Sequence, residues 1–226
     1  MYNLWLGIFF VIVNFALFLL CYRLFGRMGL YAWVGFATVL ANLQVVKTIE
    51  MFGLVMTLGN TIYASIYLTS DLLNEKYGEK AAKKAVWFGF FSLIATTIIM
   101  QLVLRFEPVE TDMAHESLTV LFEVMPQLAI GSLSAYLLSQ FVDVKLYSWL
   151  KKKCPRPEQL WIRNNGSTLV SQLLDTLTFC TIAFWGLYPL DVWLEILLTT
   201  YLIKFVVSAA ATPVLYIARR MKVAEE

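Results

Sequence analysis

The sequence predicts an all-α integral membrane protein: a polytopic bundle of about seven transmembrane helices, with six as the alternative count, in one domain over residues 1–226. Three observations predict this fold class. The chain is 59% hydrophobic and only 15% charged, with a mean hydropathy of +0.68, whereas soluble domains carry about 25% charged residues. Its apolar residues form runs long enough to cross a bilayer. Its basic residues lie mostly on one side of those runs.

A helix needs about 20 apolar residues to cross the hydrocarbon core, and seven stretches approach that length. We expect spans at approximately residues 4–22, 30–47, 51–71, 85–104, 119–148, 167–187 and 191–217. The first lacks preceding basic residues, and Arg23 and Arg27 follow it, so we interpret it as a retained helix rather than a signal peptide. The fifth is long and partly polar, so we expect it to tilt, to kink near Pro126 or to extend beyond the membrane.

The distribution of lysine and arginine predicts the orientation. With the N-terminus outside, 14 of the 18 basic residues fall in the inner segments, residues 23–29, 72–84, 149–166 and 218–226. The outer segments contain only Lys47 and Arg105, and the outer loop 105–118 is acidic. Because inner loops of membrane proteins are enriched in basic residues, we expect a multi-pass protein of the cell (cytoplasmic) membrane, with its C-terminus in the cytoplasm.

Several function classes are disfavoured by composition. Cys21, Cys154 and Cys180 are widely spaced without a C-x-x-C pair, and His115 is the only histidine. We therefore expect no metal site, no cofactor and no Ser/His/Asp catalysis. The net charge of +2 is too small to indicate nucleic-acid binding.

Polar residues nevertheless recur inside the predicted spans. In the sixth span, Thr168, Ser171, Gln172 and Asp175 are separated by three or four residues, which places them on one helical face. A charge in hydrocarbon costs about 2.5 to 3.5 kcal/mol at a helix centre, so such a stripe faces the bundle interior or a water-filled cavity. We interpret Asp175 and Gln172 as a substrate-binding pair supported by Ser171 and Thr168.

Other spans supply further candidates. Asn42 lies in the second span, and Asp71 and Glu75 lie one helical turn apart at the predicted cytoplasmic end of the third. These two carboxylates either line the mouth of a substrate cavity or simply end a helix near basic residues. Lys204, in the seventh span, is either a counter-ion for Asp175 or a substrate contact.

Carboxylates, amides and aromatic rings together suit a flat, neutral, hydrogen-bonding heterocycle. A carboxylate accepts two parallel N–H donors, and aromatic rings stack on planar faces. By position, Trp87 and Phe179 are the candidate stacking residues.

Two stretches resemble the signatures of the queuosine precursor transporters, a branch of the vitamin uptake transporter group. The segment GNTIYASIYLTSDLLNEKYGEKAAKKAVWFGF resembles S-D-x-x-x-E-x-Y-G followed by basic residues, with matches at Ser70, Asp71, Glu75, Tyr77 and Gly78. The segment RNNGSTLVSQLLDTLTF resembles R-N-x-x-S-T-x-x-x-Q-x-x-D-T, with matches at Arg163, Asn164, Ser167, Thr168, Gln172, Asp175 and Thr176. Asn74 departs from the threonine of many members, and no proline precedes Tyr63.

The resemblance implies import of 7-deazaguanine bases for tRNA queuosine modification: 7-cyano-7-deazaguanine, its 7-aminomethyl relative and queuine. It implies a fold like the substrate-binding subunits of energy-coupling-factor (ECF) transporters, although members of the family usually work without the ATPase module. We expect the base and the lipid bilayer as partners, and the sequence leaves open whether the protein forms a homo-oligomer. Asp175 would accept hydrogen bonds from the N1–H and 2-amino groups, and Gln172 would meet the carbonyl. Arg163 would line the cytoplasmic mouth, or be a topology charge.

Three alternatives remain. The nearest is the S component of an energy-coupling-factor vitamin transporter. A membrane-embedded enzyme is less favoured, because the sequence contains no G-x-S-x-G motif and no phosphate-binding loop. A structural or signalling subunit would bind no small ligand.

Overall fold

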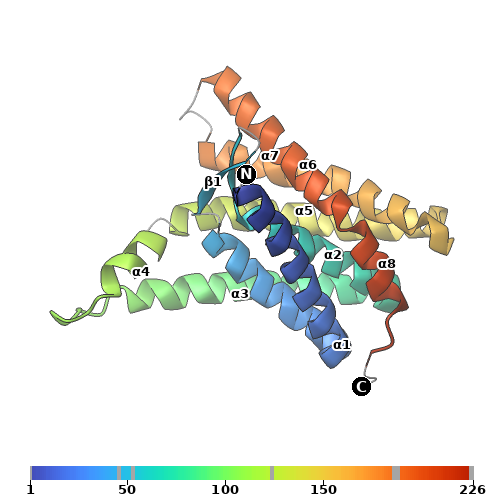
Figure 1. Ribbon diagram of the computed structural model, residues 1–226, viewed down its shortest axis with the longest axis horizontal. Coiled ribbons are helices and arrows are strands. Elements are labelled where there is room, and N and C mark those ends of the chain that lie inside the picture. The colour runs from blue at the N-terminus through green and yellow to red at the C-terminus, as the bar shows by residue number, and fades with distance from the viewer. Residues whose placement is uncertain (1, 45–46, 52–53, 123–124, 185–188, 224–226) are drawn as a thin grey trace.

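The computed structural model describes residues 2–44, 47–51, 54–122, 125–184 and 189–223. It is a helical bundle, which confirms the all-α membrane prediction, with one short β-hairpin as an addition (Figure 1). The elements are α1 (Tyr2–Gln44), β1 (Thr48–Met51), β2 (Leu54–Thr57), α2 (Gly59–Tyr77), α3 (Glu79–Val103), α4 (His115–Phe122), α5 (Met125–Lys153), the 3₁₀ turn η1 (Pro157–Gln159), α6 (Leu160–Phe184), α7 (Leu190–Ala210) and α8 (Thr212–Arg220).

The helix α1 contains a reversal at Gly26, whose φ of 53° and ψ of −136° are accessible mainly to glycine. The rings of Phe18 and Trp33 lie 5.7 Å apart, although a straight helix would separate those residues by about 22 Å. Figure 1 shows the two halves of α1 forming a V. The first two apolar runs of the sequence are therefore the arms of one tight helical hairpin.

The predicted span 51–71 is wrong at its beginning. Residues 48–57 form the antiparallel hairpin β1–β2, in which Thr48 pairs with Thr57 and Met51 with Leu54, and α2 begins only at Gly59. The segment is rich in β-branched residues, which favour strands over helices. Hydropathy alone therefore counted strand residues as part of a span.

The predicted fifth and seventh spans, residues 119–148 and 191–217, each consist of two helices in the structure. Helices α4 and α5 share the fifth, and their junction at residues 123–124 lies outside the described residues. Helices α7 and α8 share the seventh, and their break falls just before Pro213, which lacks the N–H that an interior helical position needs. Within the described residues, three helical segments are long and apolar enough to cross a membrane: Tyr2–Gln44, Glu79–Val103 and Leu190–Arg220.

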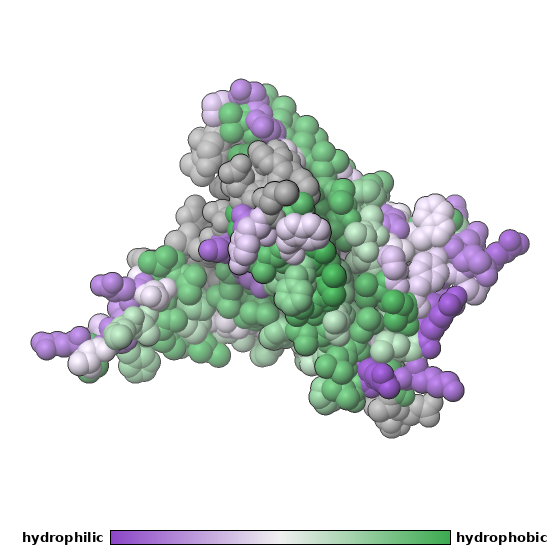
Figure 2. All heavy atoms as spheres, viewed as in Figure 1, coloured by the Kyte–Doolittle hydropathy of each residue, from purple (hydrophilic) through white to green (hydrophobic). Residues whose placement is uncertain are grey.

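On the face that Figure 2 shows, hydrophobic residues dominate between the extremities, and hydrophilic residues gather at the left and right ends, at the top and at the lower right of the view. Exposed large apolar residues include Phe9, Phe91, Leu102 and Val206. A soluble protein rarely exposes such continuous apolar surface, whereas a lipid-facing surface requires it. Many polar residues of α2, α5 and α6, among them Asp71, Asp143 and Asp175, are instead buried inside the bundle.

We expect Gly89→Ala to destabilise the packing of α3. A Cβ atom at Gly89 would collide with the hydroxyl of Tyr136 on α5 and would lie 2.9 Å from Oγ1 of Thr38 on α1. Overpacking of this kind costs about 1–3 kcal/mol, measurable as a lower thermal midpoint of the detergent-purified protein. The control is Gly131→Ala, whose Cβ would meet Ile182 at an ordinary 3.4 Å; an equal loss in both variants would contradict the prediction.

Candidate functional site

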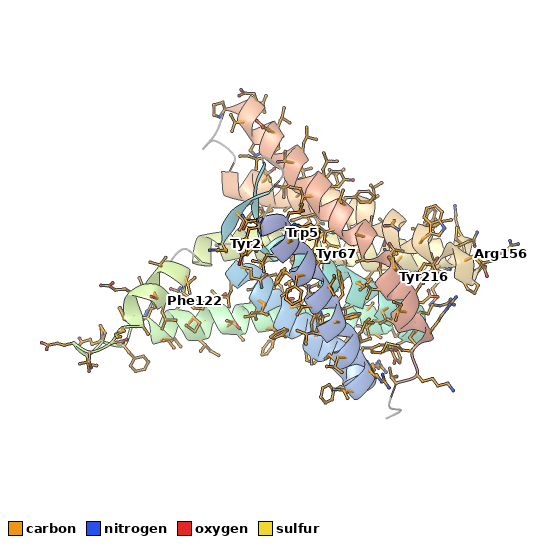
Figure 3. The ribbon with its side chains drawn as sticks, in the orientation of Figure 1. Tyr2, Trp5, Tyr67, Phe122, Arg156 and Tyr216 are labelled. Atoms are coloured by element: carbon orange, nitrogen blue, oxygen red, sulfur yellow. The ribbon has the colours of Figure 1, made fainter. Side chains whose placement is uncertain are left out.

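A ladder of buried polar residues runs through α2, α5 and α6. Residues 63, 67, 71 and 75 recur every four positions on α2, and residues 139, 143 and 147 do so on α5, so each set lies on one helical face. Tyr67 donates a hydrogen bond to Ser139 over 2.9 Å, and Tyr147 donates to Glu75 over 3.1 Å. The two helices therefore run in the same direction with matched turns. Figure 3 shows Tyr67 in the middle of the bundle and Arg156 at its far end.

The first rung, the Asp175 layer, contains an ion pair. Lys204 of α7 lies 2.7 Å from Oδ2 of Asp175, while Oδ1 accepts hydrogen bonds from Tyr63 at 2.9 Å and Ser139 at 3.2 Å. The Lys204 ammonium also lies 5.1 Å from the centre of the Tyr63 ring. Asp175 is 2% exposed and Lys204 is 9% exposed. Four helices thus meet at one buried carboxylate.

Gln172 lies beside this layer, three residues before Asp175 on α6. Its Nε2 donates to Oγ of Ser208 on α7 over 2.6 Å, whereas its Oε1 is buried without a partner in the described chain. A buried amide oxygen without a donor is destabilising, so this position is suited to a ligand that supplies one. The opposite face of α6 is apolar and exposed, with Leu169, Leu173 and Leu177.

The second rung, the Asp71 layer, lies one helical turn along α2 and α5. Ser171 donates to Oδ1 of Asp143 over 2.8 Å and also to the carbonyl of Thr168. Asp71, Asp143, Ser171 and Thr168 are each at most 1% exposed. The two predicted stripe residues Ser171 and Thr168 thus face the bundle interior.

The third rung, the Glu75 layer, gathers three cations around one carboxylate. Arg163 and Arg219 lie 2.8 and 3.1 Å from Oε1 of Glu75, and Lys151 lies 3.8 Å from Oε2. Arg163 also donates to the carbonyls of Cys154 and Arg156. This layer joins α2, α5, α6 and α8.

Lys151 also binds backbone carbonyl groups in the Glu75 layer. Its ammonium donates to the carbonyls of Asn74 and Glu75 at 2.8 and 2.6 Å. Burial lowers the pKa of Lys151, and the neighbouring Glu75 carboxylate opposes that shift.

The structure brings together Asp175, Gln172, Ser171, Thr168, Asp71, Glu75 and Arg163. It leaves Asn42 and Trp87 apart from the ladder. Asn42 donates to the carbonyl of Thr38 on its own helix, and Trp87 is 54% exposed and contacts Phe90 and Phe141 edge-on. Phe179 lies one turn beyond Asp175, close to Gly131 of α5, and stays a stacking candidate.

Helices α2 and α5 contribute partners that were not among the predicted site residues. Tyr63, Tyr67, Ser139 and Tyr147 all bind ladder residues. Their four-residue spacing in line with Asp71 or Asp143 was the available signal. Of the two roles open for Lys204, the ion pair with Asp175 is the one observed. The described residues contain no group of three or more His, Cys, Asp or Glu that could hold a metal ion.

Comparisons with known proteins found one family model and several relatives. The family model described as "Putative vitamin uptake transporter" matches residues 57–218. The chain is 52% identical over 221 residues to the "Probable queuosine precursor transporter" of Bacillus subtilis, covering 98% of this chain and 96% of the relative. It is 25% identical over 171 residues to the "Queuosine precursor transporter" of Escherichia coli, covering 74% of each. No solved structure matches the chain.

The family model covers most of the ladder, from Tyr63 to Lys204, and the Bacillus relative matches nearly the whole chain. Apolar outer helices around a buried polar interior are the organisation expected of a multi-pass membrane transporter. The chain therefore belongs to the vitamin uptake transporter family, in its queuosine precursor transporter branch.

Proposed function

We propose that this protein imports 7-deazaguanine precursors of queuosine across the cytoplasmic membrane and binds them at the Asp175 layer. The observation that carries the proposal is the buried ion pair between Lys204 and Asp175 at 2.7 Å. Intramembrane ionisable residues usually mark substrate or ion pathways. The names of the two relatives, from Bacillus subtilis and Escherichia coli, indicate the substrate class.

The ion pair is complementary to one edge of a guanine-like base. That edge presents a carbonyl acceptor, the N1–H donor and the 2-amino donor in a row. Asp175 offers two acceptor oxygens beside the Lys204 ammonium, which is a donor. In the bound state, the base takes the place of Tyr63 at Asp175, and Lys204 turns to the carbonyl. Because Nε2 of Gln172 is engaged by Ser208, Gln172 does not meet the carbonyl as the sequence suggested; its unpartnered Oε1 accepts a further N–H of the substrate instead.

This arrangement predicts a ranking of ligands. A ligand that binds only the folded protein raises its thermal midpoint, so the purified protein is heated with each candidate in turn. We expect stabilisation by 7-cyano-7-deazaguanine, 7-aminomethyl-7-deazaguanine or queuine, and less by guanine. Hypoxanthine is the matched control because it lacks only the 2-amino group of guanine and leaves the carboxylate underpaired. Equal stabilisation by hypoxanthine and guanine would contradict base recognition by Asp175.

Transport is tested in cells that can neither make queuosine nor take up its precursors. We expect queuosine to reappear in their tRNA when the deazaguanine is supplied and this protein is expressed. The expected orientation, with the N-terminus outside, is supported by the basic residues of the Glu75 layer and would place that layer at the cytoplasmic end. Precursor uptake that is equal with and without the protein would contradict the proposal.

The alternative is the substrate-binding component of an energy-coupling-factor transporter, favoured by the vitamin uptake description of the matching family. Co-purification of an ATPase module with the protein would support that alternative. Uptake by the purified protein alone in lipid vesicles would exclude a need for the module.

A further inference from the structure

The Asp71 layer contains two carboxyl groups that the substrate site does not use. Tyr67 bonds to Ser139 and Tyr147 bonds to Glu75 on either side of this layer. Because α2 and α5 run in parallel and each step is four residues, Asp71 lies opposite Asp143. This register places the two carboxyl groups side by side at one level of the bundle.

The two carboxyl groups have almost no other donors. Neither oxygen of Asp71 receives a hydrogen bond from a donor in the described chain, and neither does Oδ2 of Asp143. Ser171 donates to Oδ1 of Asp143, whereas the hydroxyl of buried Ser167 donates to the carbonyl of Asn164 on its own helix. Two carboxylates that share a buried site cannot both ionise without strong repulsion, which favours one shared proton. Asp71 and Asp143 are 1% and 0% exposed, so this proton is held away from bulk water.

The cations nearest the pair are engaged by other groups. On the same helices, the titratable neighbours are Tyr67, Glu75 and Tyr147. From α6, Arg163 approaches but is engaged by Glu75 and two carbonyls. Other cations near these helices are engaged elsewhere: Lys151 of α5 with Glu75 and two carbonyls, Lys204 of α7 with Asp175, Arg219 of α8 with Glu75, Lys76 with Tyr22 of α1, and Lys83 with Glu79 at the start of α3. Two ionised carboxylates in contact repel strongly.

We propose that Asp71 and Asp143 form a proton-binding site that couples substrate import to proton movement. This inference rests on the proposed function for its substrate and on the carboxyl pair for its proton. Chains of intramembrane carboxyl groups serve as proton relays in other transporters. The pair holds one proton when singly charged, and a second proton from outside makes it neutral. That second proton is released to the cytoplasm, so the pair ends each cycle as it began.

The ladder supplies the connection between proton and substrate. Ser139 bonds to Asp175 and lies one turn from Asp143 on α5, and Ser171 bonds to Asp143 and precedes Gln172 on α6. A base that reorganises the Asp175 layer therefore acts on Ser139, one turn from Asp143, and on Gln172, the chain neighbour of the Ser171 that bonds to Asp143. Buried Gln140, three residues before Asp143, has an amide nitrogen and oxygen without partners in the described chain. These groups can accept and donate as the carboxyl pair changes its charge.

The proton site is tested first without substrate, by infrared difference spectroscopy of the full chain in lipid vesicles. We expect a protonated carboxylic acid band that persists at neutral pH, where exposed carboxyls are ionised. Asp71→Asn and Asp143→Asn should each remove it. The matched control is Asp112→Asn, because Asp112 lies in an exposed loop and accepts from Ala114 and His115. Absence of the band from the unaltered protein, or its survival in both variants, would overturn the proton site.

Coupling is tested with 7-cyano-7-deazaguanine in the same vesicles. For each coupled proton, a pH lower by one unit outside should raise accumulation about tenfold. A pH-sensitive dye inside should report acidification when substrate enters. Asp143→Asn should lower the ratio of gradient-driven accumulation to one-for-one exchange, and Asp112→Asn should not. Uptake that ignores the imposed pH difference would overturn the coupling. Absence of any uptake, with the infrared band intact, would overturn the proposed function and support the proton site alone.

Discussion

Asp175→Asn is expected to lower deazaguanine uptake by about a hundredfold or more. The substitution keeps the shape of the side chain but replaces one acceptor oxygen with a donor, so N1–H and the 2-amino group meet no matching pair of acceptors. A hydrogen bond to a charged group contributes about 1.5 kcal/mol or more, and each 1.4 kcal/mol corresponds to about tenfold in affinity. Uptake of labelled precursor is compared at equal amounts of folded protein. Asp191→Asn, the same change at an exposed residue of α7, should have no effect.

Substitutions of Lys204, the ion-pair partner of Asp175, distinguish an effect on substrate binding from an effect on folding. Removing one member of a buried ion pair costs about 3–5 kcal/mol, whereas replacing both can be nearly neutral. We therefore expect Lys204→Met to lower the thermal midpoint sharply and the combination of Lys204→Met with Asp175→Asn to restore most of it. Uptake should stay lost in the combination. A combined variant that regains uptake together with stability would show that the pair is structural only.

Glu75→Gln is expected to be the most destabilising change in the Glu75 layer. It removes the only carboxylate among the described contacts of Arg163, which is 0% exposed, while Lys151 and Arg219 remain nearby. An uncompensated buried charge costs about 3–5 kcal/mol, and the layer joins four helices, so the thermal midpoint should fall in detergent and in lipid.

The control for Glu75→Gln is Glu79→Gln on the neighbouring helix. Glu79 forms an exposed ion pair with Lys83 four residues along α3, and such pairs contribute about 0.5 kcal/mol or less. A Glu75→Gln protein as stable as the Glu79→Gln protein would contradict the role of the Glu75 layer.

The polar stripe of α6 could be predicted from sequence because helix periodicity is local. Thr168, Ser171, Gln172 and Asp175 share one face by spacing alone, and all four are buried. The partners on α5 could not be identified in the same way, because only tertiary packing sets Ser139 against Asp175. Periodicity gives the face of each helix and leaves open which helix covers it.

The roles of aromatic and apolar residues were harder to predict from sequence for a related reason. Tyrosine and tryptophan serve as lipid-facing filler, as belt residues and as ligands, so composition does not distinguish Tyr63 at Asp175 from Trp87 at the surface. Hydropathy likewise could not show that β1 and β2 precede α2. The reversal at Gly26 depends on a single backbone conformation.

The parallel arrangement of α2 and α5 explains why three cations accompany one carboxylate. Two parallel helices end on the same side, so the negative ends of their backbone dipoles lie together, each equivalent to about half an elementary charge. Lys151 binds the last carbonyls of α2, and Arg163 binds the carbonyl of Cys154 just beyond α5. Lys76 likewise reaches the carbonyl of Met221 after α8. The excess positive charge around Glu75 is thus balanced by the backbone itself.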